Sequence, residues 1–173
     1  MVIGQLVSCH RLLGNTGNAD DHMTAEEISI ILGLEPLPLE GGMWTETWCD
    51  QHGSAIYYLM QSDDFSAMHR LDRTELWHHY GGDPVEFLLL EIDGSIRTPV
   101  LGPNLPTGER PFLAVTAGTW MGASTTGDWS LVGTTLAPPY NPDGFELGSV
   151  ERLITEFPEA ASRISTLVRG EQS

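Results

Sequence analysis

The segment from residue 65 to residue 84 holds the densest group of side chains that could do chemistry. Three histidines and a glutamate fall within eleven residues, from His69 to His79. If residues 75–80 form a strand, its side chains alternate between two faces, so Glu75 and His79 point the same way. His69 lies in the preceding apolar run and would reach the same interior. Imidazole and carboxylate groups together predict an acid–base pair or part of a metal site.

Other residues in and around this segment are candidates for binding a substrate. Tyr80 is a second candidate proton-transfer group beside His79, and aromatic residues near titratable groups are typical of ligand pockets. Each candidate also has a structural interpretation, because aromatic residues on strands commonly belong to the core and charged ones pair with neighbours. The Gly41–Gly42 pair indicates a turn, since no phosphate-binding motif surrounds it. The substrate-binding candidates are Glu40, Glu46, Tyr58, Phe65, Arg70, Trp77, His78, Trp120 and Met121.

Short apolar and aromatic runs separated by turn residues fill the middle of the chain, and this texture predicts a β-sandwich or barrel. A capping box at Thr24 and Glu27 predicts a helix over residues 25–32, and Pro158 separates two short helical stretches near the C-terminus. Ile92–Ser95 has the composition of a hairpin turn. The nine predicted strands are 43–48, 54–60, 65–71, 75–80, 85–92, 95–101, 112–116, 119–124 and 129–137.

Composition and net charge exclude some classes of binding partner. The 173 residues carry 24 Asp and Glu against 8 Lys and Arg, a formal net charge of −16. Such a chain lacks the clustered cations that nucleic acids or anionic membranes require, so we expect neither partner. Cys9 and Cys49 show no metal-ligand spacing and favour a reduced, cytoplasmic protein. We expect residues 1–22 to be a flexible N-terminal extension and residues 23–173 to be one domain.

The ordered motifs resemble one small family of cupins. They are EGGxxxET (40–47), SAIYYL (54–59), FSAMHRL (65–71), ELWHHYGGDP (75–84), TAGTW (116–120) and APPY (137–140), and the resemblance covers about residues 24–160. It implies an all-β fold, a double-stranded β-helix or cupin jelly roll, with short N- and C-terminal helices. It also implies a homodimer, a pocket at the open end of the barrel, and kinship with nucleotide-sugar epimerase-like cupins.

The resemblance also shows where this chain departs from metal-binding cupins. Those proteins supply an HxH pair, a glutamate and a further histidine. Here His69 and Glu75 occupy the first histidine and the glutamate positions, whereas Leu71 and Met121 replace the other two ligands. Two protein ligands fall short of the three typical of a catalytic metal, unless His79 supplies the third. We therefore expect no cofactor, with a divalent metal at His69, Glu75 and His79 as the alternative.

These observations lead to one main functional prediction and two alternatives. We expect an enzyme that binds a small, partly apolar substrate and catalyses isomerisation, epimerisation, dehydration or ring closure. His69 would be the general base, Glu75 would orient it or act as the acid, and His79 or Tyr80 would supply the second proton-transfer group. The alternatives are a non-catalytic cupin that binds a small molecule and a metal-dependent cupin oxygenase or isomerase.

Overall fold

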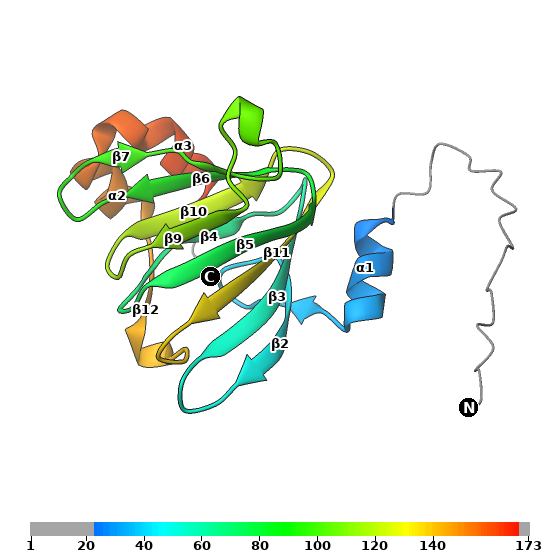
Figure 1. The fold of residues 1–173 in the computed structure, drawn as a ribbon. Helices are drawn as coiled ribbons and strands as arrows, with labels where there is room; N and C mark the ends of the chain where they lie inside the picture. The colour runs from blue at the N-terminus through cyan, green and yellow to red at the C-terminus, as the bar shows by residue number, and fades with distance from the viewer. Residues whose placement is uncertain (1–22, 170–173) are drawn as a thin grey trace, which may run out of the picture.

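The structure is a computed structural model that describes residues 23–169, and most of its regular secondary structure is β-strand (Figure 1). The predicted N-terminal extension, residues 1–22, lies outside the described residues. Helix α1 (Ala25–Leu32) begins at the predicted capping box, in which the Thr24 hydroxyl accepts the Glu27 amide and the Glu27 carboxylate accepts the Thr24 amide. Gly33 ends the helix in the left-handed region, with φ of 65°. The predicted helix is therefore confirmed at both ends.

The first of two antiparallel sheets has six strands in the order β1-β2-β3-β11-β5-β9. Its central strand β11 pairs with β3 on one side and with β5 on the other, so segments far apart in sequence become neighbours. The strands are β1 (Glu35–Pro36), β2 (Met43–Cys49), β3 (Ser54–Gln61), β5 (Glu75–Gly82), β9 (Phe112–Val115) and β11 (Trp129–Leu136).

The second sheet faces the first across the core and follows the order β12-β4-β10-β6-β7, with β8 also pairing with β6. Strands β4 and β5 are consecutive in the chain but belong to opposite sheets, so residues 72–74 cross from one layer to the other. The strands are β4 (Ser66–Leu71), β6 (Val85–Leu90), β7 (Ile96–Arg97), β8 (Val100–Leu101), β10 (Trp120–Thr125) and β12 (Phe145–Leu147).

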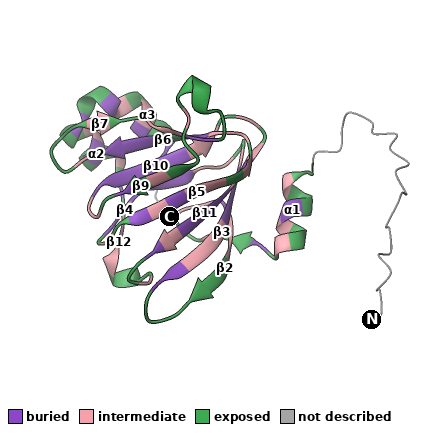
Figure 2. Ribbon diagram, viewed as in Figure 1, coloured by how far each residue is buried: buried purple, intermediate pink, exposed green. Residues whose placement is uncertain are grey.

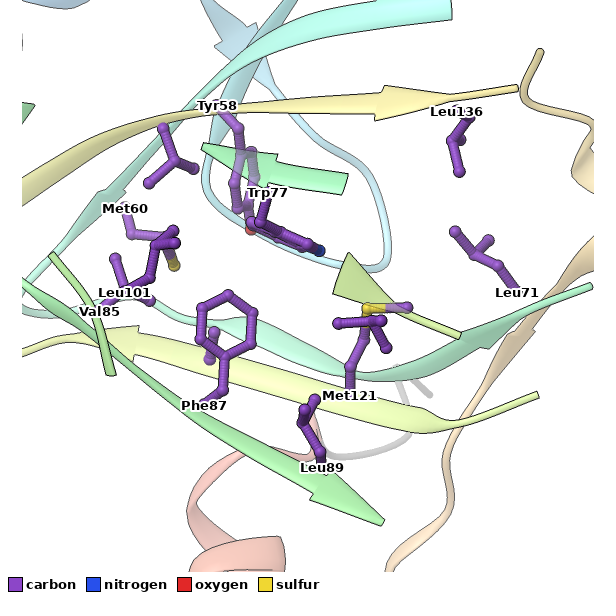
Figure 3. Packing of buried hydrophobic residues seen from close by; sticks show 13 residues of the cluster. Tyr58, Met60, Leu71, Trp77, Val85, Phe87, Leu89, Leu101, Met121 and Leu136 are labelled. Atoms are coloured by element: carbon purple, nitrogen blue, oxygen red, sulfur yellow. The ribbon is translucent and has the colours of Figure 1, made fainter. Parts of the chain in front are cut away.

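The largest apolar cluster of the described residues lies between the sheets, where inward-facing side chains pack together (Figure 3). Trp77 occupies its middle, with its ring edge-to-face with Phe87 at 5.0 Å and with Tyr58 at 5.9 Å between ring centroids. Leu71 and Leu136 lie toward one end of this cluster, and the Trp77 ring nitrogen is turned toward that end (Figure 3). The core thus has a closed middle and one end that leads to the cavity described below.

Helices α2 (Val150–Glu156) and α3 (Ala161–Thr166) pack on the outer face of the second sheet, where they bury a second apolar cluster (Figures 1 and 2). Pro158 lies in the short 3₁₀ helix Pro158–Ala160 between them, as the sequence predicted. Helix α1 covers a smaller part of the first sheet through Ile28. Two further 3₁₀ helices are Leu105–Thr107 and Pro142–Gly144. No described helix is both long and apolar enough to span a membrane.

The predicted all-β fold with short terminal helices is confirmed, and most strand limits agree within two residues. One predicted strand is wrong in detail: residues 95–101 divide into β7 and β8, because Pro99 lacks the amide that a continuous ladder needs. The sequence also missed β1 and β12. Both are short strands at sheet edges and carry too few residues to show a period-two pattern.

Candidate functional site

A cavity of about 270 Å³ opens at the Leu71 and Leu136 end of the core, walled by six strands and by the segment between β1 and β2. Its polar lining residues are Glu40, Glu46, Cys49, Ser54, His69, Glu75, Thr134 and Tyr140. Its apolar lining residues are Leu37, Pro38, Leu39, Trp44, Ala55, Ile56, Leu71, Leu136 and Phe145. Polar groups placed in an apolar cleft are what a binding site for a small organic molecule requires.

His69 enters this cavity from β4 and is almost fully buried, with 2% of its surface exposed. Its Nδ1 lies 2.8 Å from the carbonyl oxygen of Ala67, which fixes the proton on Nδ1 because a carbonyl can only accept. The ring stacks on Phe145 of β12 at 5.4 Å between centroids. Nε2 has no hydrogen-bond partner among the described residues, and none of their buried polar atoms lacks a partner. Nε2 therefore keeps accessible surface and presents its lone pair to the cavity.

Glu75 enters from the opposite sheet at the start of β5 and is 6% exposed. One carboxylate oxygen accepts a hydrogen bond from Trp77 Nε1 at 3.1 Å. Burial raises the pKa of the Glu75 carboxyl to about 7, and the Glu40 carboxylate adds to the rise. Hydrogen bonds from Thr134 and Trp77, and the charge of His69 when its ring is protonated, oppose this rise. Glu75 is thus close to half protonated at neutral pH, which is the state that a general acid or base needs.

The loop before β2 brings Glu40 to the cavity wall and requires an unusual backbone. Leu39 has φ of 68°, and Gly41 and Gly42 have φ of 93° and 70°. A side chain at Gly42 would also meet the Tyr58 ring at 2.6 Å, so glycine is required there on both counts. Glu40 Oε1 accepts a hydrogen bond from Ser66 Oγ at 2.7 Å. The predicted turn role of Gly41–Gly42 is confirmed.

Arg169 fastens this loop to the rest of the domain. Its Nε donates to the Glu40 carbonyl oxygen at 3.2 Å, and its Nη2 donates to the Asp64 carboxylate. Asp64 also accepts the Gly42 amide at 2.6 Å. Burial alone would raise the pKa of Asp64, but the hydrogen bonds from Arg169, Gly42 and the Phe65 amide outweigh it and lower the pKa. Arg169 therefore positions the backbone that carries Glu40, although it is more than a hundred residues away in sequence.

Replacing Arg169 with leucine tests this positioning role. We expect the free energy of unfolding to fall by about 1–2 kcal/mol, because several charge-assisted hydrogen bonds are lost at a half-buried site. The control is Arg97→Leu, which removes an ion pair with Glu91 in which the arginine is more exposed than Arg169, and is expected to cost less than about 1 kcal/mol. Urea denaturation of both variants measures the difference. Equal losses in the two variants would contradict the positioning role.

The outer part of the cavity contains residues that sequence reasoning missed. Tyr140 lies in the segment before β12, and its amide donates to Ser54 Oγ at 3.0 Å. Burial raises the pKa of Tyr140, and the carboxylates of Glu40 and Glu75 add to the rise. Cys49, also missed, lies at the end of β2 near Glu46. Thr134 could have been found from the sequence, since alternation along residues 129–137 turns every second side chain inward.

The structure corrects the expected role of His79. The face was predicted correctly, because His79 pairs with inward-facing Val132. His79 nevertheless lies four residues beyond Glu75, about 13 Å along the strand, and buried Trp77 separates the two. Its Nε2 lies 3.2 Å from the Asp83 carbonyl oxygen, and it is not among the residues that line the cavity.

Tyr80 and His78 also lie away from the cavity, on the outer face of the first sheet. Tyr80 is 54% exposed and contacts Tyr57 edge-to-face, and the His78 ring packs near Phe112. These two residues therefore belong to the surface of the sheet. The expected second proton-transfer group does not come from this strand's outer face, because the sheet itself lies between that face and the cavity.

The remaining substrate-binding candidates divide between the cavity and the surrounding framework. Glu40 and Glu46 line the cavity, as expected. Tyr58, Trp77 and Met121 belong to the buried core, where Tyr58 donates a hydrogen bond to the Gly41 carbonyl oxygen at 2.9 Å. Framework roles away from the cavity belong to Phe65 under the Arg169 guanidinium, Arg70 paired with Glu146, and Trp120 beneath Arg70 and Arg152.

The donors at the cavity do not fit a bound metal. Within residues 23–169, no three His, Cys, Asp or Glu side chains come close enough together to hold one. Leu71 lines the cavity beside His69, and Met121 is buried in the core, so two positions that carry histidine ligands in metal-binding cupins carry no such donor here. His79, the expected replacement, lies on the far side of Trp77.

Comparison with known proteins agrees with this architecture. A family model described as the cupin superfamily (DUF985) matches residues 26–148. The chain belongs to this family. This cupin is similar to protein SO0799 from Shewanella oneidensis, with 30% identity and a TM-score of 0.82 over 87% of this chain and all of that one. It is also similar to a hypothetical protein from Leishmania major, with 24% identity and a TM-score of 0.80 over 86% of this chain and all of that one.

A more distant match extends the fold comparison. Oxalate decarboxylase from Bacillus subtilis is 10% identical, with a TM-score of 0.55 over 78% of this cupin and 37% of that protein. This likeness supports the jelly-roll fold alone. No curated protein matches the sequence significantly. The cupin jelly roll that the sequence predicted is confirmed, whereas the epimerase-like kinship, the homodimer and the cytoplasmic location stay predictions.

Proposed function

We propose that this cupin is an enzyme that moves protons on a small organic substrate, as an isomerase, epimerase, dehydratase or cyclase. The observation that carries the proposal is the meeting of His69 and Glu75 at one cavity from opposite sheets. Both side chains are almost fully buried, and burial raises the pKa of Glu75 to about 7. A buried carboxyl group at this pKa can give or take a proton without a large energetic penalty.

The two residues would act from fixed positions. His69 Nε2 is the general base, because the contact between Nδ1 and the Ala67 carbonyl leaves the Nε2 lone pair as the accessible basic site. Glu75 in its protonated form is the acid that returns a proton to the substrate. The stacking of Phe145 on His69 and the hydrogen bond from Trp77 to Glu75 hold the two groups in place. The apolar lining excludes water, which keeps the transferred proton between enzyme and substrate.

Two features limit what the substrate can be. The cavity volume of about 270 Å³ suits a small molecule and is too small for a nucleotide sugar. An oxalate dianion, the substrate for which the Bacillus subtilis fold neighbour is named, would meet the carboxylates of Glu40, Glu46 and Glu75 here. We therefore propose neither a nucleotide sugar nor oxalate as the substrate.

The proposal is tested by exchange of carbon-bound hydrogen in D₂O. Small organic compounds are incubated with the protein, and NMR detects both binding and deuterium incorporation. We expect at least one compound to bind and to incorporate deuterium faster with the protein than without it. A compound that binds in the cavity without exchange, equally in wild type and in Glu75→Gln, would instead indicate the non-catalytic binding cupin. That result would overturn the proposed enzyme.

A further inference from the structure

We propose that the cavity selects an organic amine in its protonated form, with its apolar body inside and its ammonium group held by Glu40 and Glu46. This inference rests on the proposed function in taking the cavity as the substrate site, and it adds the chemical class of the substrate. Four observations carry it: the carboxyl groups of the lining, the absence of arginine and lysine from the described lining, the unused acceptor on His69, and the apolar part of the lining.

The acidic groups of the cavity lining have no arginine or lysine beside them among the described lining residues. Three carboxyl groups, on Glu40, Glu46 and Glu75, line the cavity, and no arginine among residues 23–169 does. The chain contains no lysine at all. Five described arginines are already bound to carboxylates elsewhere, in the pairs Arg70–Glu146, Arg73–Asp72, Arg97–Glu91, Arg152–Glu146 and Arg169–Asp64. An anionic ligand would therefore meet repulsion from these carboxylates, with no arginine or lysine of the described lining to offset it.

Glu40 and Glu46 are suited to hold the positive group. Glu40 is half-buried, and its Oε1 accepts from Ser66 Oγ at 2.7 Å. Glu46 is exposed on β2, at the outer part of the cavity. Neither carboxylate forms an ion pair within the described part of the chain. An ammonium group can reach both from solvent and would lose little hydration on entry.

The electrostatic field throughout the cavity agrees with this arrangement. Burial is the largest cause of a raised pKa at Tyr140 and at Cys49, and neighbouring carboxylates add to it in both cases. The added charge comes from Glu40 and Glu75 at Tyr140 and from Glu46 at Cys49. The negative surroundings thus add to the effect of burial in keeping each group protonated. The same surroundings stabilise a positive ligand.

His69 supplies an observation that does not depend on the carboxylates. It is 2% exposed, and its Nε2 lone pair has no partner among the described residues. The side chain is almost fully buried while Nε2 stays accessible at the cavity, so a ligand that brings a donor can complete its hydrogen bonding there. An amine N–H is such a donor, whereas a carboxylate offers only acceptors at neutral pH. No described cluster of three metal-binding side chains exists, so the cation expected here is organic.

The apolar part of the cavity lining determines which kind of body the amine can have. Leu71, Leu136, Ile56 and the rings of Trp44 and Phe145 line the cavity. They suit an apolar or aromatic body, and an aromatic ring near the ammonium group would add cation–π attraction. An amine with an aromatic or branched apolar body of about ten heavy atoms fits a volume of about 270 Å³.

Three probes of the same shape and different charge test the inference: 2-phenylethylamine, 2-phenylethanol and 3-phenylpropionate. Ligand-observed NMR at pH 8 measures their dissociation constants with the full chain. We expect the amine to bind at least about tenfold more tightly than the carboxylate, with the alcohol between them. Glu46→Gln and Glu40→Gln should each reduce this ratio severalfold. Glu86→Gln, an exposed change on β6 away from the cavity, should leave it unchanged.

Each outcome decides the inference. Carboxylate binding as tight as amine binding, or an amine that binds no better than the alcohol, would overturn it. Failure of the amine to bind at millimolar concentration would overturn it as well. The titration of Glu75 described below does not involve these probes. Loss of the charge preference together with a Glu75 midpoint of about 7 refutes the amine alone. A Glu75 midpoint near 4.5 refutes the proposed acid–base pair.

Discussion

Replacing His69 with glutamine is expected to lower deuterium incorporation into the cavity's substrate by about 10²–10⁴-fold, the usual range for loss of a general base. Glutamine is similar in length and can still donate to the Ala67 carbonyl oxygen, but it has no basic nitrogen. The packing against Phe145 is largely kept, so the fold should be retained. Exchange rates measured by NMR in D₂O, at equal substrate saturation, give the ratio.

The matched control is His52→Gln, which changes an exposed histidine in the turn between β2 and β3. It is expected to exchange at the wild-type rate. The wild-type rate should also fall as pH rises above about 7, because Glu75 then loses the proton that it returns to the substrate. Equal rates for wild type and His69→Gln, on the same substrate and with the fold retained, would refute His69 as the base.

Replacing Glu75 with glutamine is expected to stabilise the protein at pH 8 by about 3 kcal/mol. The pKa of Glu75 is about 7 in the folded protein and 4.5 as an ordinary glutamate, and each pKa unit corresponds to about 1.4 kcal/mol. Between these values the folded state holds more protons than the unfolded state, so stability falls as pH rises from about 4.5 to about 7. Glutamine avoids this loss and can still accept the hydrogen bond from Trp77.

Urea denaturation at pH 5 and at pH 8 measures this effect. The variant's advantage should be small at pH 5, where folded Glu75 is protonated, and full at pH 8. All other carboxylates are shared with wild type, so the difference between the two pH values isolates Glu75. The control Glu86→Gln changes an exposed glutamate and should show no such difference. A Glu75→Gln protein that is less stable than wild type at pH 8 would contradict the raised pKa.

The stability prediction and the activity prediction are connected. A buried carboxyl group with a raised pKa lowers the free energy of unfolding at neutral pH and gives the fold no structural benefit. Such groups are common at active sites, where function requires a strained or destabilised arrangement. The neighbouring Trp77 could be held equally well beside a neutral residue. The cost at Glu75 therefore supports a chemical role for this residue.

The elements of the fold could largely be predicted because their signals are local. The capping box at Thr24 and Glu27 specifies where α1 begins, and short apolar runs bounded by turn residues specify strands such as β3 and β11. The partnership of His69 with Glu75 was predictable in part, since both lie at strand ends joined by the short segment 72–74. Their opposite sheets follow from the jelly roll, which the ordered motifs implied.

The error at His79 has a clear physical origin. Period-two alternation decides which face a side chain occupies, but it gives no information about the depth of a cavity along that face. Trp77 fills the core between Glu75 and His79 and closes the cavity at its own position. The face of His79 was therefore predicted correctly, but its position along the barrel relative to the cavity was not.

The cavity residues from loops could not have been predicted from local patterns. Arg169 contacts Glu40 across 129 residues, and Tyr140 meets Ser54 across 86. Such contacts depend on how the sheets close, and nothing in the immediate sequence specifies them. Leu39 could not have been predicted either. It adopts a positive φ in the turn before β2, and a leucine in the sequence does not indicate such a turn.

The central claim is that His69 and Glu75 form a coupled acid–base pair in the cavity. Its most direct test is a ¹³C NMR titration of the Glu75 side-chain carboxyl carbon, in wild type and in His69→Gln. We expect a wild-type midpoint of about 7 and a higher midpoint in His69→Gln, because His69 in its protonated form lowers the pKa of Glu75. A midpoint near 4.5 that is the same in both proteins would contradict it.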